Sequence, residues 1–161
     1  MSREADSGKR IAGSRERRVE TQLTLSSYPE SMSSPGKPQI RSHRDLLVWQ
    51  RGLLLIKETY RVTTRLPKQE MYGLIAQMRR AAVSIPANIA EGHARHATRD
   101  YVRFLAIANG SLRELDTYCE VCALLEYLTE QELVTMQRLW NETASLLMKL
   151  RQALVRKLAV R

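Results

Sequence analysis

One stretch, from Arg79 to Gly92, constrains the fold of this chain more than any other part of its sequence. Around it, apolar residues recur at spacings of three and four: Ile75, Met78, Ala82, Ile85 and Ile89. A second series at the same spacings is polar: Gln77, Arg80, Ser84, Asn88, Glu91 and Arg95. Residues at these spacings share one face of a helix. The stretch therefore predicts a helix with an apolar face and a polar seam, buried on more than one side in a bundle or an oligomer.

Helical periodicity also predicts where the first two helices begin and end. The first is expected over residues 44–64, with Ser42 as its N-cap and Asp45 in its first turn. Its expected apolar stripe is Leu46, Trp49, Leu53, Ile56 and Tyr60, widened by Leu47, Leu54 and Leu55. The second is expected over residues 70–94, with a kink at Pro86 because proline lacks a backbone donor.

Capping residues predict the starts of two more helices. Thr98 is expected to cap the third, and the sequence from Thr129 to Glu132 forms a capping box for the fourth. Gly110 lies inside the third helix, which predicts that a neighbouring backbone approaches it closely. Four long helices joined by short turns predict an all-α fold, an antiparallel up-and-down four-helix bundle.

The chain is expected to divide into a disordered basic N-terminal tail (1–40) and the four-helix bundle (41–161). The tail is rich in Ser and Pro and has little periodic apolar content. No apolar run is long enough for a membrane span, and the N-terminus lacks the apolar core of a secretory signal. A cytoplasmic protein without membrane contact is expected.

Four motifs besides the Arg79–Gly92 stretch are specific enough to indicate a family. They are Leu47-Val-Trp49-Gln, Leu66-Pro67, Glu70-Met-Tyr72-Gly-Leu-Ile-Ala-Gln77 and Ala108-Asn-Gly110-Ser-Leu-Arg-Glu114-Leu. In their order and spacing, the chain from about Arg44 to the end of its fourth helix resembles the bacterial four-helix-bundle family encoded in 23S rRNA intervening sequences. The resemblance implies a ring-like homopentamer. A related architecture serves as the accessory protein of diversity-generating retroelements, which binds reverse transcriptase and nucleic acid.

The positive charge of the chain favours a polyanionic partner, RNA or DNA. Of the formal net charge of +9, residues 41–161 carry nineteen basic and twelve acidic side chains, a net of +7. The candidate nucleic-acid-binding residues are Arg95, His96, Arg99 and Arg103 at the turn between the second and third helices, with Arg79 as a further contact. The alternative is a solvated basic loop without a ligand.

The polar seam has two interpretations. The favoured one is an internal network or subunit interface formed by Arg80, Ser84, Asn88, Glu91 and Glu114. In it, a buried Arg80 would pair with Glu91 or Glu114, and Glu114→Ala would disturb assembly more than RNA affinity. The alternative is a patch that faces RNA or another ligand.

No motif for catalysis, metal binding or a cofactor is present. The sequence has no phosphate-binding glycine loop, nucleophile elbow or paired zinc motif. Cys119 and Cys122 lie three residues apart in a helical pattern, which favours two core thiols, and His93 with His96 supplies too few ligands for a zinc site. We expect no enzyme activity, no cofactor and no metal.

These observations predict a non-enzymatic oligomer, a pentamer by the resemblance, that binds structured RNA or other nucleic acid through a basic surface. The alternative function is a protein-interaction adaptor that docks a reverse transcriptase or a ribosomal component without strong nucleic-acid affinity.

Overall fold

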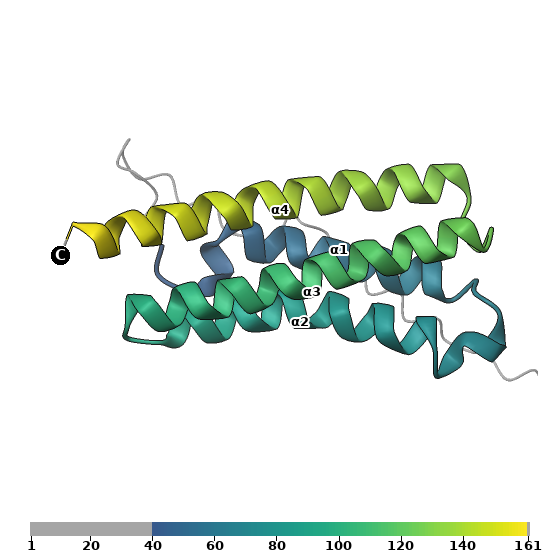
Figure 1. Ribbon diagram of the computed structural model, residues 1–161, viewed down its shortest axis with the longest axis horizontal. Coiled ribbons are helices and arrows are strands. Elements are labelled where there is room, and N and C mark those ends of the chain that lie inside the picture. Colours follow the sequence, from purple (N-terminus) through teal and green to yellow (C-terminus); the bar gives the residue numbers. More distant parts are fainter. Residues whose placement is uncertain (1–39, 161) are drawn as a thin grey trace, which may run out of the picture. The chain divides into compact units, whose positions relative to one another are not determined.

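Four long helices and two short 3-10 turns make up residues 40–160, the part of the chain that the computed structural model describes (Figure 1). The elements are η2 (His43–Asp45), α1 (Leu47–Thr63), η3 (Lys68–Met71), α2 (Leu74–Ala94), α3 (Thr98–Leu124) and α4 (Glu130–Ala159). No strand occurs among these residues, so the predicted all-α four-helix bundle is confirmed. Apart from Ile40, the predicted disordered tail lies outside the described residues, and the division into two domains stays a prediction.

Each helix packs against the two that are its neighbours around the bundle. Contacts join α1 to α2, α2 to α3, α3 to α4 and α4 back to α1, and within residues 40–160 no Cα atoms of a diagonal pair of helices lie within 8 Å of each other. The chain therefore runs up and down, with successive helices antiparallel (Figure 1). The predicted apolar face of α2 is confirmed, because its five residues are all buried in the shared core: Ile75, Met78, Ala82, Ile85 and Ile89.

The buried face of α1 matches the predicted stripe only in part, since Leu46 and Leu55 are buried as expected. Val48, Gly52, Leu55, Thr59 and Val62 are buried, whereas two residues of the predicted stripe, Leu53 and Tyr60, are 40% and 42% exposed. The stripe was predicted from hydrophobicity, but the space beside α2 favours smaller side chains.

Two features let these smaller residues occupy the buried face of α1. A Cβ atom on Gly52 would lie 3.3 Å from Cβ of Pro86, so the two helices meet there almost backbone to ring. Thr59 is fully buried because its hydroxyl donates to the carbonyl of Leu55 at 2.8 Å. The helical assignment of α2 continues through Pro86.

Three of the four predicted helix starts were displaced. Ser42 does form a capping box, but it caps the 3-10 turn η2, and the extended backbone of Leu46 separates that turn from α1. Helix α2 begins four residues later than predicted, at Leu74, after η3. Thr98 is the first residue of α3 and not its cap, since the N-cap position is Ala97. Local cap chemistry alone did not distinguish a long helix from the short turn that precedes it.

The fourth start, the capping box of α4, is confirmed, and it also ties α4 to α1. The carboxylate of Glu132 accepts hydrogen bonds from the backbone N–H and the hydroxyl of Thr129, and it pairs with Arg65 at 2.7 Å and Arg61 at 3.2 Å. Burial by itself would raise the pKa of Glu132. The bonds from Thr129 and the charges of Arg65 and Arg61 outweigh burial, so its pKa lies below the ordinary value.

Helix α3 ends in a Schellman motif whose left-handed position holds Glu126 and not glycine. Glu126 has φ of 56°, its N–H donates to Ala123 O at 3.0 Å, and the N–H of Tyr127 donates to Cys122 O at 2.9 Å. These bonds cap the carbonyls at the end of α3, and the chain then turns through Leu128 into α4.

The close approach predicted at Gly110 occurs elsewhere in the bundle. A Cβ atom at Gly110 would meet nothing within 4 Å, so that prediction was wrong. A Cβ atom at Gly92 would lie 2.7 Å from Cδ2 of Tyr101 and 2.8 Å from Cβ of Phe104. Gly92, near the end of α2, is therefore a point of close approach between α2 and α3.

We expect Gly92→Ala to destabilise the bundle and Gly110→Ala to stabilise it. Overpacking costs about 1–3 kcal/mol, and at Gly92 it exceeds the gain of about 1 kcal/mol in helix propensity, because Cβ of Phe104 cannot rotate away. At Gly110 only the gain remains, about 0.5–1 kcal/mol. Urea denaturation of both variants measures the two signs, and a stabilising Gly92→Ala would contradict the close approach.

We expect Glu132→Gln to lower the free energy of unfolding by about 1–2 kcal/mol at pH 7, since the variant keeps the shape of the side chain and loses its charged bonds. Because the native pKa of Glu132 is depressed, its contribution is present above the unfolded pKa of about 4.3 and is lost as the pH falls through the native pKa. The difference between wild type and variant should therefore shrink below about pH 4. Urea denaturation at several pH values measures it, and a difference independent of pH would argue against a charged role.

Candidate nucleic-acid interface

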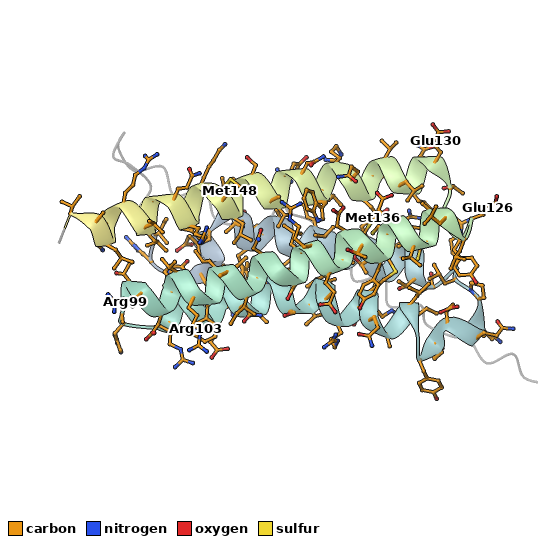
Figure 2. All side chains as sticks on the ribbon, in the orientation of Figure 1. Arg99, Arg103, Glu126, Glu130, Met136 and Met148 are labelled. Carbon is orange, nitrogen blue, oxygen red and sulfur yellow. The ribbon has the colours of Figure 1, made fainter. Side chains whose placement is uncertain are left out.

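The turn between α2 and α3 places its basic residues in solvent. Arg95 follows the last residue of α2, and its side chain pairs with Glu91 and lies over the ring of Phe104, 5.0 Å from the ring centroid. His96, Arg99 and Arg103 are also exposed. Figure 2 shows Arg99 and Arg103 near the beginning of α3. The structure thus brings together the four residues predicted at this turn, with Arg95 the most restrained of them.

The fifth predicted contact, Arg79, lies apart from this turn. Its Nε donates to Oγ1 of Thr63 at 2.9 Å, and its guanidinium lies 4.7 Å from the ring centroid of Tyr60. Arg95 lies sixteen positions further along the chain, a rise of about 24 Å. Arg79 therefore packs against α1 and does not extend the basic turn.

The predicted polar seam divides into separate groups along α2. Arg80 pairs with Glu114 of α3 at 2.9 Å, and Tyr118 donates to the same carboxylate oxygen at 3.1 Å. The Arg80 side chain is 68% exposed in the single chain, so the predicted Arg80–Glu114 pair lies at the surface of the bundle, and its role in a subunit interface stays a prediction. The long side chain of Arg80 reaches across the outer edge of the α2–α3 contact, where water still surrounds the charge.

A neutral group lies at the middle of α2. The hydroxyl of Ser111 donates to Ser84 Oγ at 2.9 Å, and Nδ2 of Asn88 donates to Ser84 Oγ at 3.0 Å and to Ser84 O at 2.8 Å. Ser111 is buried, so these bonds satisfy polar atoms between the two helices. The seam residue nearest the basic turn, Glu91, pairs with Arg95 and not with Arg80.

The up-and-down order of the helices gathers the excess charge at one end of the bundle. The contacts Gly52–Pro86, Ser84–Ser111 and Arg51–Glu142 mark its middle. We call residues 40–52, 85–110 and 143–160 the basic end, and residues 53–84 and 111–142 the opposite end. The basic end has ten Lys and Arg against three carboxylates, a net of +7, whereas the opposite end has eight against nine, a net of −1. Arg99 and Arg103 lie far from Glu126 and Glu130 (Figure 2).

Sequence reasoning missed half of this surface. Arg41 and Arg44 precede α1, and Lys149, Arg151, Arg156 and Lys157 lie on the last turns of α4. Ala106 and Asn109 of α3 share a hollow with Arg151, which brings the end of α4 beside the beginning of α3. The predicted up-and-down topology already implied that these segments meet, and adding the charges by end would have found them.

Four aromatic rings of the basic end form a series of edge-to-face contacts. The ring centroids of His43 and Trp49 are 5.1 Å apart, and those of His43 and His93 are 6.4 Å apart. The ring centroids of His93 and Tyr101 are 5.9 Å apart. The hydroxyl of Tyr101 is buried and has no hydrogen-bond partner among residues 40–160. Burial raises the pKa of Tyr101 to about 12. The phenol is therefore neutral at physiological pH and carries one unsatisfied donor.

The two cysteines are in an apolar environment between the helices. Burial raises the pKa of Cys119 to about 12 and that of Cys122 to about 11, which leaves both as thiols at neutral pH. Cys122 is fully buried, with Sγ 3.7 Å from Sδ of Met78. Within residues 40–160, no three His, Cys, Asp or Glu side chains gather as they would around a metal ion.

None of the helices in residues 40–160 combines the length and the apolar character needed to span a bilayer.

Comparison with known proteins gives a family and one informative solved structure. The family model described as "23S rRNA-intervening sequence protein" matches residues 44–149. A crystal structure of a protein of unknown function from the S23 ribosomal protein family of Bacteroides thetaiotaomicron superposes with a TM-score of 0.61 at 23% identity, over 65% of this chain and 98% of that chain. At this identity the likeness concerns the fold alone. Among curated proteins, none matches.

We expect Tyr101→Phe to leave the free energy of unfolding unchanged or to raise it by up to about 1 kcal/mol, because the substitution removes a buried donor without a partner. Thermal and urea denaturation of the two proteins measure the difference. A loss of more than about 1 kcal/mol would show that the hydroxyl has a partner, such as an ordered water.

Proposed function

Because this chain belongs to the family of 23S rRNA-intervening sequence proteins, we propose that it binds structured RNA through the basic end of its bundle. The observation that carries the proposal is the concentration of ten Lys and Arg side chains against three carboxylates on that end. The proposed activity is binding in the cytoplasm, without catalysis. Phosphate groups attract such a surface through the release of their counterions.

Most cations of the basic end are free to contact phosphate. Among residues 40–160, only Arg51 and Arg95 of this group form salt bridges, with Glu142 and Glu91. The other eight are Arg41, Arg44, Arg99, Arg103, Lys149, Arg151, Arg156 and Lys157. A phosphate contact at these positions breaks no internal ion pair, and the arginines offer two parallel donors to each phosphate.

The arrangement of these cations favours recognition of RNA shape over recognition of sequence. They lie before α1, at the beginning of α3 and toward the end of α4, where Arg151 shares a hollow with Ala106 and Asn109 of α3. Arg and Lys contacts to phosphate position a nucleic acid without reading its bases. Double-stranded RNA is recognised mainly by shape and by its backbone. A folded RNA hairpin is therefore the proposed ligand class.

We further propose that the protein acts as a homo-oligomer, a pentamer if it follows the family resemblance. An oligomer with its subunits side by side and parallel would place several basic ends on one surface and multiply the phosphate contacts. In this proposal the Arg80–Glu114 pair and the Ser84–Asn88–Ser111 group are structural. They hold α2 against α3 and have no role in RNA contact.

The second candidate function, a protein adaptor for a reverse transcriptase or ribosomal component, is favoured by one observation. A hollow of about 270 Å³ lies between α1 and α4, lined by Ile40, Asp45, Leu46, Leu47, Val48, Leu146 and Leu150. Leu47 on its rim is 62% exposed. Exposed apolar patches on a soluble protein mark contacts with other proteins.

We expect the full chain to bind a structured rRNA hairpin with an affinity that falls steeply with salt. The double variant Arg99→Glu/Arg103→Glu should bind at least about 10-fold more weakly at low salt, because it removes two phosphate contacts and adds two repulsive charges. Its slope of log affinity against log salt should be shallower by about two units. Fluorescence anisotropy across a salt series measures both quantities.

The matched control is Lys57→Glu/Lys68→Glu, which makes the same change in net charge at two exposed positions of the opposite end that form no salt bridge within residues 40–160, and it should retain most of the affinity. Equal losses in the two double variants would mean that net charge matters and the basic end does not. If the wild-type protein failed to bind even at low salt, the RNA proposal would be wrong and the adaptor would be favoured. Equal affinity for an unrelated duplex would reduce the proposal to polyanion binding.

A further inference from the structure

An aromatic side chain protrudes from the opposite end of the bundle. Tyr72 is 93% exposed and lies between η3 and the first residue of α2. Its backbone is held in place, because Glu70 O accepts from the N–H of Gly73 at 3.1 Å and Glu70 Oε2 accepts from the N–H of Leu74 at 3.2 Å. A large ring on a braced turn loses little conformational freedom when it binds, which is typical of an anchor residue.

A cavity of about 240 Å³ lies between α3 and α4, and its size and lining suit a single aromatic side chain. Its apolar lining consists of Cys119, Ala123, Leu133, Val134, Met136 and Trp140. Asp116, Glu120 and Gln137 supply the polar groups. The cavity is smaller than the roughly 300–1,000 Å³ of sites for drug-sized ligands, so a single side chain suits it better. A tyrosine would place its ring on the apolar lining and donate its hydroxyl to a carboxylate.

The chain segments that contain Tyr72 and the cavity carry opposite net charge. Residues 53–84, which include Tyr72, have six Lys and Arg against two carboxylates, a net of +4. Residues 111–142, which include the cavity, have two against seven, a net of −5. No salt bridge within residues 40–160 involves four of these carboxylates: Asp116, Glu120, Glu126 and Glu130. Complementary charge steers two surfaces together and fixes their register.

Tyr72 and the cavity also lie at the same level along the bundle. The pair Arg80–Glu114 shows which parts of α2 and α3 are level. Because the two helices are antiparallel, the segment before Leu74 is level with the segment of α3 that follows Glu120. One feature belongs to the α1–α2 side and the other to the α3–α4 side. Two copies that lie side by side and parallel would bring them into contact.

We propose that Tyr72 of one copy of this chain inserts into the α3–α4 cavity of a second copy. The inference rests on the homo-oligomer part of the proposed function and adds which surfaces meet. The interface is heterologous, so each copy offers one tyrosine and one cavity, and successive copies form a closed ring if the rotation closes. In such an assembly all basic ends point the same way.

The test uses two variants that each remove one half of the interface. Tyr72→Ala removes the anchor, and Ala123→Trp fills the cavity; each alone should weaken self-association at least about 30-fold, the loss of a typical anchor residue. Mixed in equal amounts, the two variants should form a dimer that contains one copy of each, because the first retains its cavity and the second its tyrosine. Analytical ultracentrifugation of the full chain at several concentrations measures the masses.

Two further variants separate the possible failures. Glu120→Lys perturbs the cavity rim without filling the cavity and should also weaken assembly, whereas Leu47→Ala removes an exposed apolar side chain at the basic end and should not. If the wild type is an oligomer and the Tyr72→Ala and Glu120→Lys variants have the same mass as the wild type, the Tyr72 inference is wrong but the homo-oligomer proposal is not affected. If the wild type is a monomer, both the Tyr72 inference and the homo-oligomer proposal are wrong. The RNA-binding proposal is tested separately and would not be affected.

Discussion

The bundle depends on how closely α2 approaches both of its neighbours. Gly52 of α1 meets the ring of Pro86, and Gly92 leaves no room for a Cβ atom beside Tyr101 and Phe104. The Gly52–Pro86 contact and the Ser84–Ser111 bond lie near the middle of α2, and Gly92 lies near its end. Because interiors are close-packed, an added methyl group at such a point moves a whole helix. These small residues therefore determine where α3 lies along α2. They also determine which charged side chains of the two helices lie at the same height along the bundle.

Charge separation between the two ends follows from topology. Each basic segment is modest by itself, and the excess emerges only when an up-and-down chain brings the beginnings of α1 and α3 beside the ends of α2 and α4. Cations at the end of α4 also complement the negative end of its helix dipole. The same folding order separates the opposite end into a cationic α1–α2 side and an anionic α3–α4 side. The proposed RNA surface and the proposed subunit contact thus both depend on the same up-and-down arrangement.

Local signals predicted the fold well, and they failed wherever the outcome depended on a neighbouring helix. The periodicity of α2 and the capping box at Thr129 depend on a few adjacent residues and were confirmed. Of the buried line of α1, Leu55 was predicted, but Gly52 and Thr59 were missed because they carry no hydrophobic signal, although the space beside α2 requires small side chains. At the candidate site, the exposed turn was found from sequence, but the contribution of α4 and the restraint of Arg95 by Phe104 required the three-dimensional arrangement.

The uneven ends also make the folded domain an electric dipole directed along its longest axis. In the field of a polyanion such a body experiences a torque as well as an attraction, and it rotates so that the helix ends with Arg99 and Arg156 lead. Orientation before contact removes much of the angular search that slows association of neutral surfaces. The long, narrow form of a four-helix bundle increases this effect, because the same charges placed on a sphere would be separated by a shorter distance.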